Sequence, residues 1–138
     1  MMQSTDCPCQ SGNPYTSCCE PFHTKRQLPD TPEQLMRSRY SAFALGLVTY
    51  IMETTHRQSE SYVKATAFWR EQLKRYCQQT EFLGLNILSA PEVTATSTEG
   101  YVHFIATLKL NPIEKPEQLT EQEEHSHFRK VSGRWLFC

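Results

Sequence analysis

The first half of the chain carries hydrophobic residues at helical spacing. Thr31 suits the N-cap of a helix, Pro32 fits its first turn, and Gln34 completes a T-x-x-Q capping box. The apolar residues that follow fall on one face of this helix: Met36, Tyr40, Phe43 and Leu47. Gly46 is the expected stop, because glycine readily adopts the left-handed conformation that ends a helix. Arg39 lies at the edge of the apolar face, where we expect it either to find a carboxylate or carbonyl partner or to extend into solvent.

Two further helices are predicted before the pattern changes, over 48–56 and over 63–77. Ser59 or Ser61 can cap the start of the second one. One face of that helix is apolar and consists of Ala65, Trp69, Leu73 and Tyr76.

The second half of the chain alternates between apolar and polar residues, as strands do. This alternation predicts strands over 82–88, 93–98, 101–110, 121–131 and 134–138. Glu99-Gly100 and Ser132-Gly133 are the expected tight turns, and 111–120 is the longest loop. Helices followed by an antiparallel meander of about four strands define the α+β class. The same order argues against a parallel βαβ sheet with a nucleotide site.

Length and charge limit the possible classes of function. A chain of 138 residues, 38% of them hydrophobic, suits one domain and a small appendage. The formal charge of -1 provides no long-range attraction for anions, so we expect neither sequence-specific nucleic-acid binding nor membrane binding. The longest apolar run, 42–52, is too short to span a bilayer, and Met1–Asp6 contains no export signal. We therefore expect a cytoplasmic protein.

Four of the six cysteines lie within thirteen residues near the start of the chain: Cys7, Cys9, Cys18 and Cys19. Adjacent cysteines such as Cys18 and Cys19 do not readily form a disulfide with each other, because the ring would be strained. Four thiolates that converge on one point suit a closed tetrahedral site for one structural Zn²⁺ ion, with Zn–S distances of about 2.3 Å. Turns at Ser11-Gly12 and Asn13-Pro14 would bring the two cysteine pairs together.

Other roles for these cysteines fit less well. A disulfide would require export to an oxidising compartment. Redox catalysis favours C-x-x-C at the start of a helix, and the sequence has no such motif. A catalytic zinc keeps one coordination position open, whereas four thiolates leave none. His23 could compete as a ligand, but we expect it to pack beside the site or to support its ligands.

The cysteine spacing, C-P-C-x-S-G-x-x-Y-x-x-C-C, resembles the SEC-C motif, a zinc-binding module of the bacterial preprotein-translocase motor. Gln10 stands where that motif often has glycine. The segment L-M-R-S-R-Y-x-A-F at 35–43, then Leu83-Gly84-Leu85 and the G-R-W ending, extend the resemblance to the YchJ-like family of small bacterial proteins. Members of that family often carry histidine before the glutamate of H-E-x-S-x-F, where this chain has Glu123.

The resemblance implies two units: a SEC-C zinc-binding motif over 1–25 and a nuclear-transport-factor-2-like α+β domain over 26–138. In that fold a curved antiparallel sheet wraps around helices to form a cone, which commonly encloses a pocket. We expect the second unit to have its own core, with the first tethered ahead of it. Within the pocket we hypothesise an ion pair between Arg39 and Glu124. The full set of residues predicted for the pocket is Arg39, Tyr40, His56, Trp69, Glu124, Ser126, Phe128 and Trp135.

Three functional classes remain open. The first is a non-enzymatic, zinc-binding adaptor whose cysteine module docks to a protein or ribosomal partner, as the resemblance to the translocase module implies. The second is small-molecule binding or catalysis in the cone, and the third is a purely structural zinc. We lean away from an enzyme, because the histidines are dispersed and no catalytic constellation is evident. His103, His125 and His127 are expected to point outward from the sheet.

Overall fold

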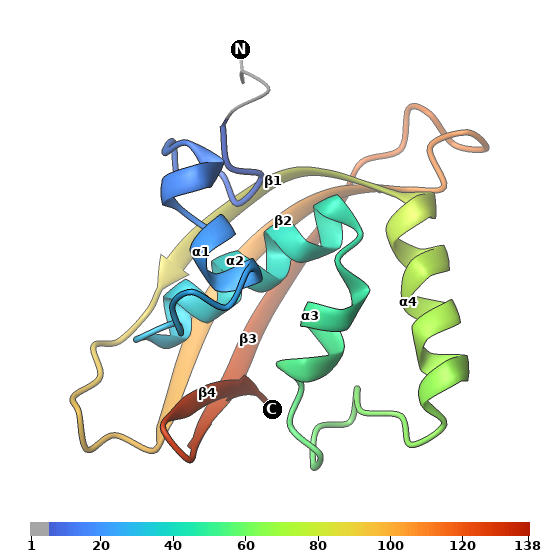
Figure 1. Ribbon diagram of the computed structural model, residues 1–138. Helices are drawn as coiled ribbons and strands as arrows, with labels where there is room; N and C mark the ends of the chain where they lie inside the picture. Colours follow the sequence, from blue (N-terminus) through green and yellow to red (C-terminus); the bar gives the residue numbers. More distant parts are fainter. Residues whose placement is uncertain (1–5) are drawn as a thin grey trace.

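In the computed structural model, which describes residues 6–138, three helices cover one face of a curved antiparallel sheet (Figure 1). The helices are α2 (Pro32–Leu45), α3 (Val48–Glu53) and α4 (Thr66–Gln79). The sheet has the order β1-β2-β3-β4, with strands Thr80–Ser89, Glu99–Leu110, Thr120–Val131 and Arg134–Phe137. Two short elements precede α2, the 3-10 helix η1 (Tyr15–Ser17) and helix α1 (Glu20–His23). This architecture confirms the predicted α+β class and its four-stranded meander.

Helix α2 begins and ends where its sequence signals predict. The Thr31 side chain accepts a hydrogen bond from the backbone N–H of Gln34 at 3.1 Å. The Gln34 side chain reaches the N–H of Asp30 at 2.6 Å rather than that of Thr31, so the capping box is extended by one residue. Gly46 ends the helix with φ of 74°, in the left-handed region.

The other two helices differ from the predicted ranges at their ends. Helix α3 stops at Glu53 instead of residue 56, because the side chains of Thr54 and Thr55 hydrogen-bond to the carbonyl of Ile51 and favour a turn. Helix α4 starts at Thr66, and no side chain caps it. The predicted serine cap was wrong, since the hydroxyl of Ser59 accepts from the N–H of Ser61 in the preceding loop.

The predicted strand over 93–98 and the predicted turn at Glu99-Gly100 were also wrong. Residues 94–97 form the turn, in which the N–H of Thr94 donates to the Ser97 hydroxyl at 2.8 Å. Threonine and serine side chains can satisfy backbone groups locally, which favours a turn over a strand. Glu99 and Gly100 instead open β2, where they pair with residues of β3.

The main core lies between α2 and the covered face of the sheet. Leu35, Met36 and Tyr40 of α2 contribute to it, and Trp135 of β4 is 2% exposed. The sheet contributes alternate residues, as the period of two requires: Leu85, Val102, Phe104, Ala106, Leu108 and Phe128. Burial of these side chains fixes the position of α2 across the sheet, and α2 in turn positions both candidate sites described below.

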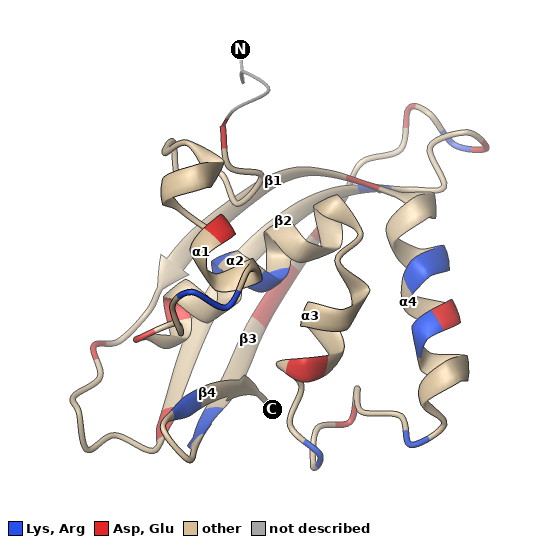
Figure 2. Cartoon of the chain, in the orientation of Figure 1, with Lys and Arg blue, Asp and Glu red and all other residues tan. Residues whose placement is uncertain are grey.

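Acidic and basic residues are mixed along the chain, and α4 has blue and red segments next to each other (Figure 2). This distribution agrees with the formal charge of -1. Within residues 6–138, none of the helices is both long and apolar enough to cross a membrane.

The contact between β2 and the start of α2 predicts that Gly100→Ala destabilises the fold. A Cβ at this position would overlap Cγ of Pro32, and the rigid ring cannot move aside easily. We expect a loss of about 1–3 kcal/mol in the free energy of unfolding, measured by denaturant titration. The matched control is Gly84→Ala in β1, whose Cβ would meet Thr107 at an ordinary 3.5 Å. Equal stability of the two variants would contradict the close packing of Gly100 on Pro32.

Candidate functional site

The four clustered cysteines lie on a folded loop at the start of the described chain, residues 6–19. The backbone N–H of Cys7 donates to the carbonyl of Asn13 at 2.9 Å and closes the loop. Gln10 and Gly12 have φ of 66° and 89°, so the turns depend on two left-handed residues. Gln10 pays a steric penalty of roughly 1–2 kcal/mol that the more usual glycine would avoid.

The sulfur atoms converge on one point. The four Sγ atoms all lie within 4.8 Å of one another, with Cys9 and Cys18 at 3.6 Å and Cys18 and Cys19 at 3.9 Å. A tetrahedron with Zn–S bonds of about 2.3 Å has S···S edges of about 3.8 Å. Cys7, Cys9 and Cys19 are at most 1% exposed, and none of the described cysteines forms a disulfide. The cluster therefore has the donor set and spacing of a closed four-sulfur metal site.

The electrostatics of the cluster also favour a cation. Hydrogen bonds from Cys19 and Cys7 lower the pKa of Cys9, whereas hydrogen bonding to Cys7 and Cys9, with burial, raises the pKa of Cys19. Buried thiols this close cannot all ionise next to one another without an opposing charge. A bound divalent cation supplies that charge and allows all four sulfurs to act as thiolate ligands.

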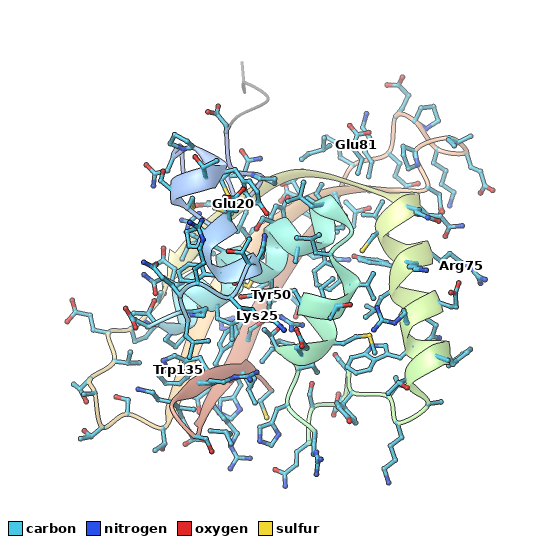
Figure 3. The ribbon with its side chains drawn as sticks, viewed as in Figure 1. Glu20, Lys25, Tyr50, Arg75, Glu81 and Trp135 are labelled. Carbon is cyan, nitrogen blue, oxygen red and sulfur yellow. The ribbon has the colours of Figure 1, made fainter. Side chains whose placement is uncertain are left out.

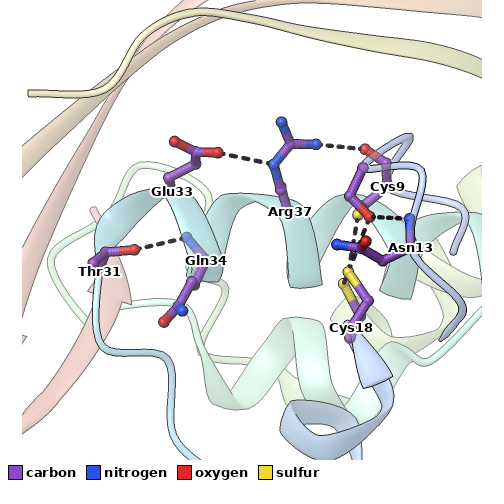
Figure 4. A network of polar contacts seen from close by, with 9 residues as sticks. Cys9, Asn13, Cys18, Thr31, Glu33, Gln34 and Arg37 are labelled. Atoms are coloured by element: carbon purple, nitrogen blue, oxygen red, sulfur yellow. Dashed lines mark hydrogen bonds and ion pairs between the residues drawn. The ribbon is translucent and has the colours of Figure 1, made fainter. Parts of the chain in front are cut away.

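Arg37 connects the cysteine loop to α2 (Figure 4). Its Nη1 donates to the carbonyl of Cys9 at 2.9 Å, and its Nε donates to the Glu33 carboxylate at 3.0 Å, one helical turn away. Burial alone would lower the pKa of Arg37, but the hydrogen bond to Glu33 and the attraction of Cys9 outweigh burial and raise it. Arg37 thus holds the loop in place and sets a fixed positive charge beside the sulfur cluster.

His23 lies next to the cluster without acting as a ligand. Its Nε2 donates to the carbonyl of Ser38 at 2.7 Å, so Nδ1 is free of a proton and accepts from the hydroxyl of Tyr15 at 2.7 Å. Burial lowers the pKa of His23 and favours this neutral form. The Tyr50 ring packs edge-on against the imidazole, with centroids 4.9 Å apart. His23 therefore links the cysteine loop to α2, through the Tyr15 hydroxyl on one side and the Ser38 carbonyl on the other.

Further contacts join the first segment to the helices. Figure 3 shows Lys25 and Tyr50 where this segment meets α3, and Lys25 forms an ion pair with Glu53 at 2.8 Å. Phe22 packs on the small apolar cluster of Ala42, Tyr50 and Ile51. Residues 6–25 are therefore packed on the helices and do not simply precede them. The division at residues 25 and 26 stays a prediction, and residues 1–5 of the first unit lie outside the described chain.

A second candidate site is a pocket of about 460 Å³ between the helices and the covered face of the sheet. Of the residues predicted for it, Arg39, Tyr40, Trp69, Glu124 and Ser126 line it. The Tyr40 hydroxyl donates to the carbonyl of Gly84 at 2.9 Å, and burial raises its pKa to about 12. Tyr40 is therefore a neutral wall residue at physiological pH.

The other three predicted residues lie outside this lining. Phe128 is fully buried in the core, and Trp135 is also buried, with its indole N–H donating to the carbonyl of Asp30 at 3.1 Å. His56 follows α3, where its Nδ1 accepts from the backbone N–H of Gln58 at 2.9 Å. The strand alternation correctly predicted the face of the sheet on which Phe128 lies. It could not show that this face is covered by the core near Phe128 and lines the pocket near Glu124 and Ser126.

The predicted ion pair between Arg39 and Glu124 is not formed. The guanidinium of Arg39 donates to Ile51, Thr54 and Thr55, and no ion pair within residues 6–138 includes Arg39. These partners lie in the last turn of α3 and directly after it, and they carry no sequence signal that would have identified them. The sequence reasoning also missed several lining residues: Phe43, Thr55, Leu73, Tyr76, Phe104 and Phe137.

The histidines of the sheet lie on its uncovered face, as predicted. Nε2 of His103 is 2.6 Å from the Glu123 carboxylate, and the rings of His103 and His125 stack with centroids 3.8 Å apart. These three side chains could share a metal ion, but the two from β3 are exposed and only His103 is partly buried. The cysteine cluster, with four sulfurs and three of them buried, is the stronger candidate.

Comparison with known proteins supports both the α+β domain and the cysteine cluster that precedes it. The family model described as YchJ, middle NTF2-like domain, matches residues 31–138. A UPF0225 protein of Haemophilus influenzae is 37% identical over 134 residues, which cover 97% of this chain and 76% of the relative. A UPF0225 protein of Pectobacterium carotovorum is also 37% identical, over 135 residues, with 97% and 81% covered.

Two solved structures have a similar fold. The solution structure of RPA3114, a SEC-C motif containing protein from Rhodopseudomonas palustris, has a TM-score of 0.78 and 34% identity, covering 95% of this chain and 93% of that one. The crystal structure of a SEC-C motif containing protein from Psychrobacter arcticus has a TM-score of 0.74 and 28% identity, covering 95% and 78%. The chain thus belongs to the YchJ-like family, with a SEC-C-type cysteine cluster ahead of a nuclear-transport-factor-2-like domain.

Proposed function

We propose that the protein is a zinc-binding adaptor whose cysteine module docks to a protein partner, either free or part of the ribosome. The observation that carries the metal assignment is the closed set of four converging sulfurs. Thiolate ligands in a tetrahedral set favour Zn²⁺, and four of them leave no position for a substrate or an activated water. The ion therefore has a structural role and holds the loop in the shape that a partner would recognise.

The exposed surface of the module supports docking, although not through its aromatic side chains. The hydroxyl of Tyr15 is engaged by His23, and Phe22 packs on the helices. The outer surface of the loop consists instead of Gly12, Asn13, Pro14, Thr16 and Ser17, which are all exposed. Lys25, Arg26 and the 52% exposed Leu28 continue this surface.

A small pocket next to this surface provides a place for one partner side chain. It has a volume of about 110 Å³ and lies between the segment that follows α1 and the residues of α3 and β4. Its walls include Phe22 and Leu28, and charged groups stand at Lys25, Glu53 and Arg134. An apolar floor with charged residues around it is typical of a site that accepts one anchoring side chain of a protein. We refer to the exposed loop, Lys25, Arg26, Leu28 and this pocket as the docking surface.

The metal assignment predicts one zinc ion per chain in protein purified under reducing conditions, measured by elemental analysis. Chelation is expected to lower the melting temperature, because an ion that binds only the folded state stabilises that state. Cys18→Ser combined with Cys19→Ser should abolish zinc binding, whereas Cys138→Ser, outside the cluster, should retain the full equivalent. Reduced protein without zinc would contradict the proposal.

The docking role predicts a partner that is captured from a bacterial lysate by the intact protein and lost with the zinc. Arg26→Ala should weaken capture while zinc content stays at one equivalent, because Arg26 is exposed and its ion pair with Glu20, at 3.4 Å, contributes little to stability. Arg75→Ala is the matched control, since Arg75 is an exposed arginine on α4, away from the docking surface (Figure 3). Capture that is unchanged in the double cysteine variant would place the function elsewhere.

A further inference from the structure

The pocket between the helices and the sheet contains a buried arginine side chain, Arg39, whose hydrogen-bond partners are all uncharged. Arg39 projects from α2 and is 7% exposed. Its Nη1 donates to the carbonyl of Ile51 at 3.0 Å and to the hydroxyls of Thr54 and Thr55 at 2.7 and 3.1 Å. The guanidinium carbon lies 4.5 Å from the centre of the Phe137 ring. None of the ion pairs among the described residues supplies a carboxylate to it.

The guanidinium keeps its charge in this position. Burial lowers the pKa of Arg39 to about 10, which still leaves it protonated at neutral pH. A buried charge without a counter-ion is costly, and proteins usually pair such a group. The missing negative charge would have to come from an anion that enters the pocket.

The remaining N–H groups of Arg39 are available to the pocket. All three hydrogen bonds of the side chain come from Nη1, so Nε and Nη2 have no acceptor within the described chain. No enclosed side-chain nitrogen of the described residues lacks a partner, so these two nitrogens must reach accessible space. Because Arg39 lines the pocket, we take the pocket as the space that they face. Nε and Nη2 form the edge of a guanidinium that binds a carboxylate through two parallel hydrogen bonds.

The rest of the pocket is suited to an apolar body. Of the described residues that line it, only Arg39 and Glu124 are charged. Most of the wall is aromatic or aliphatic, with Met36, Phe43, Trp69, Leu73, Tyr76 and Phe104. The volume of about 460 Å³ falls within the usual range for small organic ligands. Glu124 has a single negative charge that would repel a second anionic group on the ligand.

We propose that this pocket binds a small organic monocarboxylate with an aromatic or aliphatic body, held by Arg39 through its Nε and Nη2. The carboxylate supplies the charge that the protein does not, and the body lies against the apolar walls. Glu124 selects against dicarboxylates. This proposal does not rest on the zinc-dependent docking proposed above, because the two pockets have no described lining residue in common. They are adjacent at Thr54, which accepts from Arg39 and lines the docking pocket.

Calorimetric titration of the intact, reduced protein with matched probes tests the proposal. The probes are 2-naphthoate, its neutral analogue 2-naphthamide and the dianion 2,6-naphthalenedicarboxylate. We expect 2-naphthoate to bind at least tenfold more tightly than either of the other two. Arg39→Met should remove the advantage of the acid over the amide, whereas Arg75→Met on the exposed side of α4 should retain it. Equal affinities for the acid and the amide, or no binding of 2-naphthoate at millimolar concentration, would overturn the proposal.

A measurement on the wild-type chain keeps the test valid if Arg39→Met does not fold. In ¹⁵N-resolved NMR spectra, the Nε–H signal of Arg39 should shift on addition of 2-naphthoate and not on addition of 2-naphthamide. The Nε–H signal of Arg37, which is already bound to Glu33, should stay unchanged. A response confined to other residues would place the acid elsewhere and contradict the assigned site.

Discussion

The packing of α2 on the sheet determines the geometry of both candidate sites. Successive side chains of a helix point about 100° apart, so three consecutive residues can contact three different parts of the structure. Arg37 bonds to the cysteine loop, Ser38 offers its carbonyl to His23 and its hydroxyl to Tyr50, and Arg39 enters the pocket. The apolar side chains of Leu35, Met36 and Tyr40 hold the helix in the one rotation that makes these contacts simultaneous.

This arrangement makes the cysteine module part of the folded body. Bringing four thiolates together is unfavourable without a cation, so a bound metal ion would stabilise both the loop and the contacts that the loop makes. Those contacts extend through His23 to α2 and through Lys25 to α3. Loss of a bound metal ion would therefore affect the packing of the helices as well as the proposed docking surface.

Local chemistry explains which features could be predicted from the sequence. The cap at Thr31, the stop at Gly46 and the cysteine spacing each depend on neighbouring residues, and the alternation of β2 reports its burial directly. Other features depend on distant partners or on competing local bonds. Thr94 and Thr96 have high strand propensity, yet their hydroxyls bond to each other in a turn that the Thr94 N–H closes on Ser97. Thr54 and Thr55 continue a helical pattern, yet their hydroxyls bond to the carbonyl of Ile51 and the helix ends. The partners of Arg39 were unpredictable, because they depend on how α3 ends.

The strand β4 and the turn after α3 meet in a way that affects the order of assembly. The N–H of Phe137 donates to the carbonyl of Thr54, and the N–H of His56 donates to the carbonyl of Phe137, both at 2.8 Å. Residues from the middle and the far end of the sequence thus close the charged end of the pocket together. Such long-range pairing has a large loop-closure entropy and usually forms late in folding. In the folded protein the aromatic ring of Phe137 covers the guanidinium of Arg39, so we expect this charge to lose its hydration only when the pairing forms.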